Sequence, residues 1–349
     1  MPDNGNPFFS IVIPTYNRGN LLRRAINSFL DQKFQNFEII ISDNNSIDNT
    51  KEIVESFNDK KIIYSKNNEN IGFVLNVEKA ILMASGKYII THGDDDVILY
   101  SNGLQRIHDL IIEKEYGFMM INHLSKDRQN KEIACFWVNK SEDIYITKNM
   151  QSISVINFLE EVAIGFLSGL VFKNENIQLD DFINSEMAPW IKILFRLSKK
   201  YGAAFIHDTY IIHDWSNREI PNYIIDKKNR IFFENYYDCI TEELLNKNEA
   251  DLYKKFYFDQ LRKQYRWLFP AIKYYTNNKN LKAYKNRLIY LNNNFKSDIK
   301  LWIYYLISTC LPKFLLSFIR KHVHFNRIES NINYKELDII KKRYYELTE

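Results

Sequence analysis

The first hundred residues alternate short apolar runs with stretches in which apolar residues recur at helical spacing. The apolar runs predict buried strands at residues 9–13, 37–41, 61–65 and 87–91. Between them, apolar residues repeat every three or four positions, which predicts three helices that each bury one face. Alternation of this length is typical of βαβ units around a mostly parallel sheet. We therefore predict an α/β fold with a doubly wound sheet.

The rest of the chain changes character near residue 220. Before that point, the pattern predicts further strands near residues 116–122, 168–172 and 205–213, and a helix near residues 189–200. From about residue 222 onward, charged and aromatic residues alternate at helical spacing with almost no glycine. We expect a catalytic domain over residues 1–220 and a helical region over residues 221–349.

Polar loops follow three of the predicted strands, at residues 14–18, 42–46 and 93–96. The carboxyl ends of parallel strands meet at one edge of a sheet, where ligands of such folds bind. The third loop contains Asp94, Asp95 and Asp96. Adjacent carboxylates repel one another unless they are solvated or share a cation, and hard divalent metals prefer oxygen ligands. The plainer explanation is an acidic turn after a strand. The position of the run in the longer pattern favours the metal.

Composition excludes several classes of protein. Hydrophobic residues make up 46% and charged residues 26%, as in an ordinary globular protein. The net charge of +4 gives no argument for nucleic acid as a partner. The three cysteines are scattered without a CxxC pair, so neither a zinc cluster nor a disulfide framework is expected. The first ten residues lack the features of a secretory signal, and we expect a cytoplasmic location.

Four segments together resemble the signatures of the family 2 glycosyltransferases, which have the GT-A fold, a Rossmann-like α/β arrangement. In chain order they are Ile11 to Arg18, Ser42 to Thr50, Asn70-Ile71-Gly72 with Asn76 and the segment from Ala84 to Ile89, and Gly93 to Asp96. The last occupies the place of the family's metal-binding "DXD" element. Each segment is weak alone, but four in order over residues 9–97 are specific.

The resemblance implies a binding site for a nucleotide-sugar donor, with UDP as the default nucleotide. The residues that it implies for this role are Pro14, Thr15, Tyr16, Asn17, Arg18, Asp43, Asn45, Asn70, Gly72, Asn76, Asp94, Asp95 and Arg218. Asp43 suits recognition of the base, because a carboxylate accepts the imide N–H of uracil. Tyr16 offers a ring on which a base can stack.

The resemblance also implies Mn²⁺ or Mg²⁺ as a cofactor that neutralises the departing diphosphate. Asp95 is the first choice as a ligand, with Asp94 and Asp96 as alternatives. His213 ends a predicted strand where the family often has a histidine that reaches the metal or the diphosphate. An acid commonly stands where this chain has Gly93, so the two aspartates that face the metal stay open.

An inverting transfer needs a general base for the acceptor hydroxyl. The family usually places an acid just before an apolar helix that contains a tryptophan, and Glu186 holds that position here. Asp181 and Asp180 are rivals a few residues earlier. Three aromatic residues offer either a platform for the sugar or ordinary core packing: Phe166, Trp190 and Trp215. We expect His92 to point into or along the sheet and His207 to belong to the core.

An apolar stretch from Leu301 to Ile319 has about the length of a membrane span, but Pro312 and Lys313 interrupt it. An interfacial helix pair with basic flanks fits this pattern better. The alternative is a buried hairpin that packs on the catalytic domain or on a second subunit. We expect peripheral contact with a membrane, where lipid-linked acceptors are found, and leave a homo-oligomer open.

The combined prediction is a metal-dependent, inverting glycosyltransferase that moves a sugar from a nucleotide diphosphate to a glycan or lipid-linked glycan. The expected setting is bacterial surface polysaccharide synthesis, of O-antigen or capsule. A sugar nucleotidyltransferase is one alternative, but it would show a glycine-rich loop where this chain has residues 14–18. A non-catalytic glycan-binding protein is another, and the intact acids argue against it.

Overall fold

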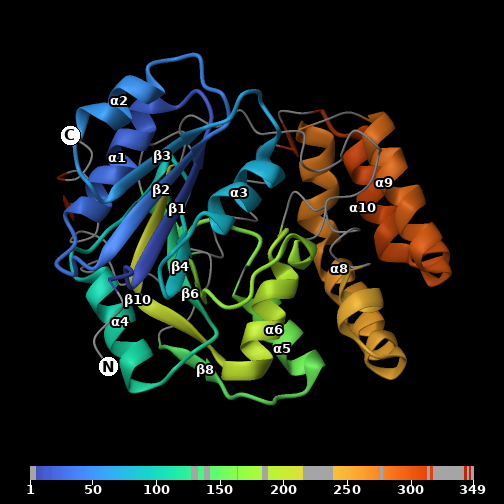
Figure 1. The fold of residues 1–349 in the computed structure, drawn as a ribbon. Helices are drawn as coiled ribbons and strands as arrows, with labels where there is room; N and C mark the ends of the chain where they lie inside the picture. Colours follow the sequence, from blue (N-terminus) through green and yellow to red (C-terminus); the bar gives the residue numbers. More distant parts are fainter. Residues whose placement is uncertain are drawn as a thin grey trace. The chain divides into compact units, whose positions relative to one another are not determined.

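The computed structural model describes residues 5–126, 133–136, 142–162, 164–182, 188–214, 239–275, 278–312, 315–316, 342–343 and 346. The chain divides into two compact units (Figure 1). The first comprises Met1–Asn217 with Asn333–Glu349, and the second comprises Arg218–Ile332. The first unit contains the sheet, and the second is helical.

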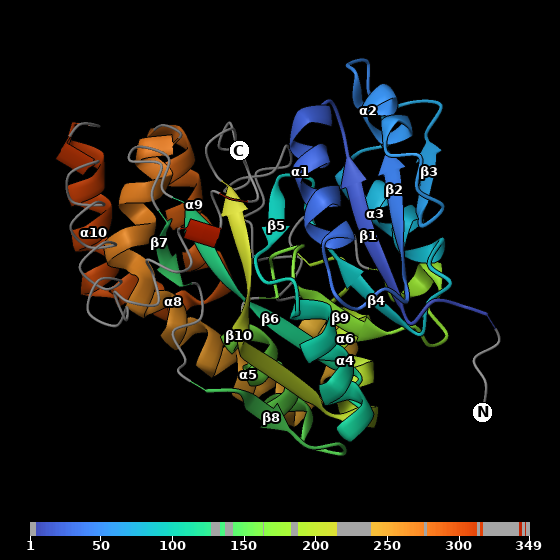
Figure 2. The same ribbon diagram turned by 90° about the vertical axis from the view of Figure 1, so that its left-hand side faces the viewer.

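The described strands of the first unit form a single ten-stranded sheet (Figure 2). Their bounds are β1 Phe9–Thr15, β2 Phe37–Asp43, β3 Ile62–Lys66, β4 Tyr88–Thr91, β5 Asp96–Ile98, β6 Phe118–Lys126, β7 Ile133–Phe136, β8 Ile144–Ile146, β9 Leu170–Lys173 and β10 Ala203–Asp214. The order is β3-β2-β1-β4-β9-β6-β10-β5, with β7 on β6 and β8 on β10.

The sheet is parallel in its first half and mixed beyond it. Strands β3, β2, β1 and β4 are all parallel, as the strand–helix alternation predicts. β9 then runs antiparallel to both β4 and β6, and β5 runs antiparallel to β10. The α/β fold class is therefore confirmed, and the parallel part of the sheet is the part that βαβ units build.

Helices cover both faces of the parallel half. The helices of this unit are α1 Gly19–Leu30, α2 Thr50–Ser56, α3 Phe73–Leu82, α4 Gly103–Glu113, α5 Ser152–Glu161 and α6 Ile191–Tyr201, with the short 3₁₀ turn η1 Leu179–Asp181. α1 and α4 pack into one apolar cluster with β1 and β2, and α3 lies behind the same strands (Figure 2). Coverage on both faces explains why these strands are continuous apolar runs rather than alternating ones.

The start of α1 is held by a distant loop. β1 runs through Pro14 to Thr15, two residues beyond the predicted strand, and α1 begins at Gly19. The Gly19 N–H donates to Asp48 Oδ2 at 3.1 Å, and Asp48 Oδ1 accepts from the Thr50 N–H at the start of α2 at 3.1 Å. One carboxylate thus satisfies the first turns of two helices.

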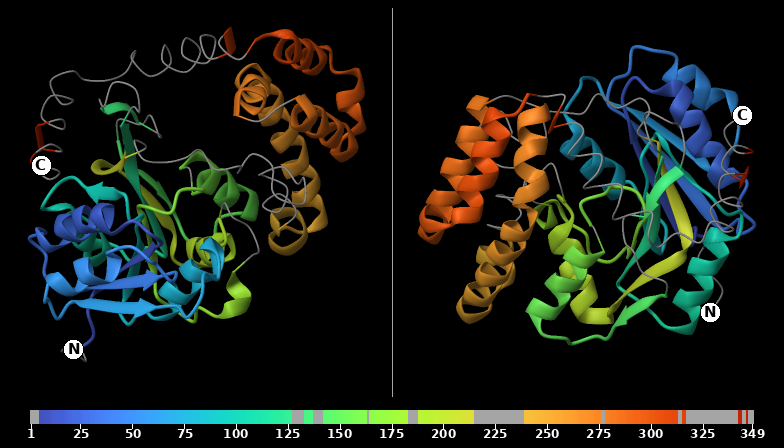
Figure 3. Two further views of the ribbon diagram at one scale, coloured as in Figure 1. Left: turned by 90° about the horizontal axis from the view of Figure 1, so that it is seen from above. Right: turned by 180° about the vertical axis from the view of Figure 1, so that it is seen from behind.

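The second unit is helical where it is described (Figure 3). It contains the π-helical turn η3 Ile240–Leu244, α8 Lys247–Tyr275, α9 Asn278–Leu291, the 3₁₀ turn η4 Asn293–Ser297, and α10 Ile299–Cys310. Its core consists of Phe258, Phe269, Leu281, Tyr284, Leu288, Phe295 and Leu301. Among the described helices, none combines the length and apolarity that crossing a bilayer requires.

Gly117 offers a test of how tightly the sheet packs on α6. A Cβ at this position would lie 2.1 Å from the carbonyl oxygen of Leu197. The backbone cannot withdraw easily, because the Gly117 N–H donates to Gly202 O at 2.9 Å. We expect Gly117→Ala to lower the free energy of unfolding by about 2 kcal/mol. Urea denaturation measures this, and a midpoint equal to that of the wild type would contradict the packing described.

Candidate functional site

The carboxyl ends of β1, β2 and β4 bring together the three polar loops that the sequence singles out. Thr15 and Asp43 are paired neighbours on β1 and β2. The Thr15 hydroxyl donates to Asp94 Oδ2 at 2.8 Å, and the Asn44 N–H donates to Thr15 O at 2.9 Å. We call this meeting point of the three loops the carboxylate edge.

Arg18 lies against two of the three adjacent aspartates. Its Nη1 is 3.0 Å from Asp94 Oδ1 and 3.3 Å from Asp95 Oδ2. Asp94, Asp95 and Asp96 are all buried. Burial and the charge of Asp95 raise the pKa of Asp94, Arg18 and the Thr15 hydroxyl oppose the rise, and the resulting pKa is about 6. A cation is therefore already part of the arrangement that keeps these carboxylates ionised.

Asp96 belongs to a different set of contacts. β5 pairs with β10, which places His213 directly opposite Asp96, and His213 Nδ1 is 2.8 Å from Asp96 Oδ2. The Ser168 hydroxyl donates to the same oxygen and accepts from the Gly93 N–H at 2.8 Å. Of the three aspartates, Asp94 and Asp95 therefore contact Arg18, whereas Asp96 contacts His213.

Gly93 is required by the close packing of this turn. A Cβ there would lie 2.8 Å from Asp96 Oδ2 and 3.2 Å from Ser168 Oγ. This explains in physical terms why the chain lacks the acid that commonly stands at this position. A side chain at residue 93 would displace the group that holds Asp96.

His213 has one ring nitrogen engaged and one left over. Nδ1 faces Asp96, while the buried Nε2 has no hydrogen-bond partner among the described residues. The ring lies 4.7 Å from that of His123 and 4.9 Å from that of Phe166, measured between centroids. The sequence reasoning missed His123, because a single polar residue inside an apolar strand gives no distinguishing signal.

The chemistry of these donors suits a divalent cation, although Asp94, Asp95 and His213 are not among the described residues whose ligand atoms lie within 4.8 Å of one another. Asp94 and Asp95 supply carboxylate oxygens that already share a positive charge, and His213 supplies an unpartnered imidazole nitrogen close to Asp96. Oxygen ligands suit Mg²⁺ and Mn²⁺, and Mn²⁺ also accepts imidazole.

Asp43 is fully buried and held from two sides. Its Oδ1 accepts from the Ser46 N–H at 2.8 Å, and its Oδ2 accepts from the hydroxyl of Tyr64 on β3. Burial and the neighbouring carboxylate raise the pKa of Tyr64, so the phenol stays protonated and donates. Sequence reasoning missed Tyr64, since it treated β3 only as a short strand. The ring of Tyr16 is 43% exposed at the neighbouring loop.

Asn17 joins the loop after β1 to the loop after β2. Its backbone lies in the left-handed region, with φ of 53°. From there its N–H donates to Ser46 Oγ at 2.8 Å, and its Oδ1 accepts from the Ile47 N–H at 2.8 Å. Asn45, with φ of 68°, takes the same uncommon conformation in the second loop.

Asn70, Gly72 and Asn76 lie beside this loop and shape it from within. Asn70 Oδ1 accepts from the Asn44 side chain at 2.8 Å and from the Gly72 N–H at 3.0 Å. Asn76 is buried, donates to Ser42 O at 2.9 Å and accepts from the Ser42 hydroxyl at 2.7 Å. Their amide groups are therefore used inside the protein.

Of the acids predicted to act as the general base, the structure describes the side chain of Asp181 but not that of Glu186. Glu186, Arg218 and Trp215 lie outside the described residues. Asp181 ends η1, where its Oδ2 accepts from the Gln178 N–H at 2.9 Å and lies 3.3 Å from Arg196 Nη2. Its carboxylate therefore has structural partners.

The structure decides the roles of two aromatic side chains that the sequence analysis considers, Trp190 and His207. Trp190 is buried, and its indole N–H donates to Ile164 O at 2.9 Å, so it belongs to the core rather than to a sugar platform. The assignment of His207 to the core is wrong, because its side chain is 31% exposed and its Nδ1 lies 2.8 Å from Asp143 Oδ1. The bulge in β10 between Ile206 and Tyr210 turns it outward.

Asp143, His207 and Asp208 have ligand atoms within 4.8 Å of one another, which is close enough for a metal. Arg106, however, already pairs with both acids, at 2.9 Å from Asp143 and 3.5 Å from Asp208. One positive charge of the protein thus faces these two acids, as Arg18 faces Asp94 and Asp95.

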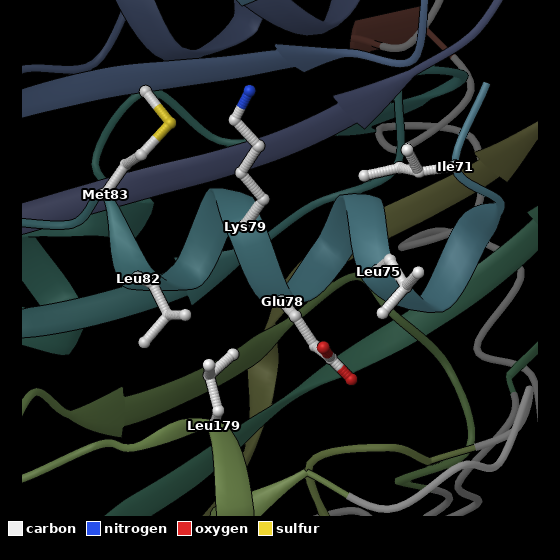
Figure 4. Close-up of a pocket in the computed structure, with 7 residues that line it drawn as sticks. All are labelled: Ile71, Leu75, Glu78, Lys79, Leu82, Met83 and Leu179. Carbon is white, nitrogen blue, oxygen red and sulfur yellow. The ribbon is translucent and has the colours of Figure 1, made fainter. Parts of the chain in front are cut away.

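An apolar groove of about 420 Å³ lies along α3 and does not coincide with the carboxylate edge. Leu75, Glu78 and Leu82 point from α3 toward Leu179 (Figure 4). Burial raises the pKa of Glu78. The residues that line this groove include none of the three adjacent aspartates.

The buried histidines predict that mild acid destabilises the fold. Burial lowers the pKa of His92 from 6.5 to about 4 and that of His123 well below 6.5. As the pH falls below about 6.5, these histidines become protonated in the unfolded chain before they do so in the folded protein. Protonation therefore favours unfolding, and the free energy of unfolding decreases on acidification. His92 alone should cost about 2 kcal/mol of unfolding free energy between pH 7 and pH 5.

Asp94 opposes this effect, since its raised pKa lets the folded state bind a proton first, and it offsets about 1 kcal/mol. Urea unfolding at pH 7, 6 and 5 measures the net decline. His92→Gln, which cannot titrate, should make the decline shallower. A free energy of unfolding that stays constant or rises on acidification would show that these histidines are not buried in neutral form.

Comparison with known proteins places this geometry in a family. Residues 10–152 match the sequence model described as glycosyl transferase family 2. The chain is 29% identical over 212 residues to a GalNAc(5)-diNAcBac-PP-undecaprenol beta-1,3-glucosyltransferase of Campylobacter jejuni, covering 59% of this chain and 64% of that protein. It is 30% identical over 190 residues to the abequosyltransferase RfbV of Salmonella typhimurium, covering 50% of this chain and 55% of RfbV. The chain thus spans less than two thirds of either relative.

Solved structures agree on the fold. TarS of S. aureus in complex with UDP-GlcNAc superposes with a TM-score of 0.62 at 16% identity, over 90% of this chain and 91% of that one. The mannosyltransferase PcManGT from Pyrobaculum calidifontis, in complex with GDP-Man and Mn²⁺, gives a TM-score of 0.51 at 13% identity, over 89% and 88%. Residues 10–152 thus form a domain that matches glycosyltransferase family 2, and the chain has the fold of these solved glycosyltransferases, the GT-A fold.

Proposed function

We propose that this protein transfers one sugar, with inversion, from a nucleotide-diphosphate donor to a glycan or lipid-linked glycan. The observation that carries the proposal is the carboxylate edge. There Asp43 lies at the end of β2, and hydrogen bonds from Tyr64 and Ser46 fix the orientation of its carboxylate. Asp94 and Asp95, which contact Arg18, follow β4, and Asp94 accepts a hydrogen bond from Thr15. In this proposal Asp43 would bind the base of a nucleoside diphosphate. The Asp94 and Asp95 carboxylates, with the positive charge beside them, would lie at its diphosphate.

The donor nucleotide is proposed to be UDP. Asp43 offers a buried, oriented carboxylate for the imide N–H of uracil, and the half-exposed Tyr16 ring offers a stacking surface at the neighbouring loop. A solved structure with the same fold, TarS, is in complex with UDP-GlcNAc. PcManGT, however, is in complex with GDP-Man, so the fold alone does not select the nucleotide.

We propose that Asp95, Asp94 and His213 hold Mn²⁺ or Mg²⁺, with Asp96 orienting His213. When bound, the ion would compensate the charge that grows on the diphosphate as it leaves. In this proposal Nδ1 donates its N–H to Asp96, which leaves the lone pair of the neutral ring on Nε2. Arg18, which lies against Asp94 and Asp95, would place a positive charge beside a phosphate bound at this edge.

In the transfer itself, the acceptor oxygen forms a bond to the anomeric carbon while the bond from that carbon to the diphosphate oxygen breaks. The acceptor proton passes to a general base, for which we propose Glu186. We also propose that the acceptor belongs to bacterial surface polysaccharide synthesis on the cytoplasmic side of the membrane. Support for this setting comes from the names of two relatives, one acting on an undecaprenol-linked glycan and one an abequosyltransferase.

The metal assignment predicts the behaviour of Asp95→Asn, which preserves shape and removes charge. We expect transfer to fall by about 10²-fold or more, because one group that compensates the leaving charge is lost. The Mn²⁺-dependent thermal stabilisation by UDP should disappear in the same variant. Glu113→Gln, which changes an exposed acid on α4, is the matched control. Full metal-dependent activity in Asp95→Asn would refute the assignment.

The base assignment predicts different results for two acids. Glu186→Gln should lower kcat by about 10²- to 10⁴-fold with donor binding unchanged. Asp181→Asn should stay within about tenfold of the wild type, because its carboxylate is already engaged by Gln178 and Arg196. Steady-state kinetics with a saturating UDP-sugar measure both. The reverse ranking would assign the role of base to Asp181.

A panel of nucleotide sugars tests the proposed function as a whole. With Mn²⁺ or Mg²⁺ present, thermal unfolding should shift upward for one nucleotide class and little for the others. If no nucleotide diphosphate stabilises the protein, the carboxylate edge does not bind such donors and the proposal fails.

A further inference from the structure

α10 is apolar on two opposite sides, and only one of them is buried. Leu301 and Ser308 are fully buried on the inner side, and Trp302 and Tyr305 pack partly against the core of this unit. On the other side, four aliphatic side chains are exposed: Ile299 at 73%, Ile303 at 47%, Leu306 at 55% and Ile307 at 40%. With about 3.6 residues per turn, these four fall on one face, which we call the outer stripe.

A helix that is apolar all round is normally covered all round. A contiguous exposed apolar face rimmed by polar residues therefore marks an interaction surface. The described residues leave the outer stripe open to solvent. The outer stripe could be covered by a lipid bilayer or by a second copy of the chain, and the charges around it distinguish between the two.

Positive charge is concentrated around this helix. Residues 260–312 contain ten lysines and arginines and a single carboxylate, Asp298, in a chain whose net charge is only +4. Asp298 is used internally, because it accepts from the Lys300 N–H at 3.0 Å at the start of α10 and lies 3.1 Å from Arg262 Nε. Asp259, just before this segment, also pairs with Arg262, at 2.9 Å, so both nearby acids lie on the same arginine. The exposed lysines include Lys279, Lys282, Lys296 and Lys300.

Two amphipathic aromatic residues of α10 itself, Trp302 and Tyr305, pack partly against the core of the unit and contact lysines. The indole N–H of Trp302 donates to Lys296 O at 2.9 Å. Lys285 Nζ lies 4.6 Å from the ring centroid of Trp302 and 5.0 Å from that of Tyr305. Lysine stems and aromatic rings of this kind suit the boundary between water and hydrocarbon.

We propose that the outer stripe of α10 docks on an anionic phospholipid bilayer, with the helix lying in the plane of the interface. α10 has 12 residues, which is too short to cross a bilayer but suits an interfacial helix with aliphatic residues on one side and lysines around it. A second copy of the chain is the other occupant to consider. It would bring the same lysines face to face, which like-charge repulsion opposes.

This surface is independent of the proposed transfer, since none of its residues belongs to the carboxylate edge. The full chain should sediment with vesicles that mix phosphatidylglycerol and phosphatidylcholine, but only weakly with pure phosphatidylcholine. Added salt should release it, because exposed charges are screened. No sedimentation with the anionic vesicles would overturn the proposal.

Substitutions locate the contact. Ile303→Glu combined with Leu306→Glu should lower partitioning onto anionic vesicles by about tenfold or more, since the burial of each aliphatic side chain is lost. Lys296→Gln combined with Lys300→Gln should lower it by about tenfold, and only on anionic vesicles. Leu252→Glu is the matched control, because Leu252 is an exposed leucine on α8, away from the stripe. Equal binding by the control and the stripe variant would contradict the assignment.

Two further readouts keep the outcomes distinct. Circular dichroism and the thermal midpoint establish that each variant is folded, and metal-dependent stabilisation by UDP should be unchanged in the stripe variant. Loss of vesicle binding with retained UDP binding supports the membrane surface whether or not the transfer reaction is correct. Light scattering without vesicles provides the opposing result. If the stripe variant converts a dimer to a monomer, the stripe is an interface between copies and the lipid proposal is wrong.

Discussion

The burial of adjacent carboxylates at the end of β4 is the constraint on which the carboxylate edge depends. Removing a carboxylate from water costs several kcal/mol unless a partner compensates it. Asp94 and Asp95 meet this cost through Arg18, and Asp94 also through the hydroxyl of Thr15. Asp96 meets it through Ser168 and His213. The partners come from β1, from the loop after it, from the turn before β9 and from β10, so the charge cluster joins segments that are far apart in sequence.

The parallel half of the sheet was predictable from the sequence because its strands obey local rules. Each of β1 to β4 is an apolar run followed by a turn-forming polar loop, and parallel pairing then brings the loop ends together without further information. The meeting of Thr15, Asp43 and Asp94 follows from that topology. Arg18 was also within reach of prediction, since it closes the first of these loops.

The remaining features depend on pairing between distant segments, for which a single sequence carries little signal. Tyr64 reaches Asp43 only because β3 lies next to β2 in a particular register. His213 meets Asp96 only because β5 pairs antiparallel with β10, a connection that no local pattern indicates. His207 was assigned to the core for the related reason that a bulge in β10 cannot be seen in an apolar run. Such a bulge moves a side chain from one face of a strand to the other.

The tight turn at Gly93 has a consequence for protein engineering. The segment from Gly93 to Asp96 cannot simply be replaced by the more common form of the motif, which has an acid at the position of Gly93. An acid introduced at residue 93 would meet Asp96 and Ser168, and relieving that overlap would mean moving β10, which carries His213. An acid at residue 93 would therefore require compensating changes in both β5 and β10, the paired strands that carry Asp96 and His213.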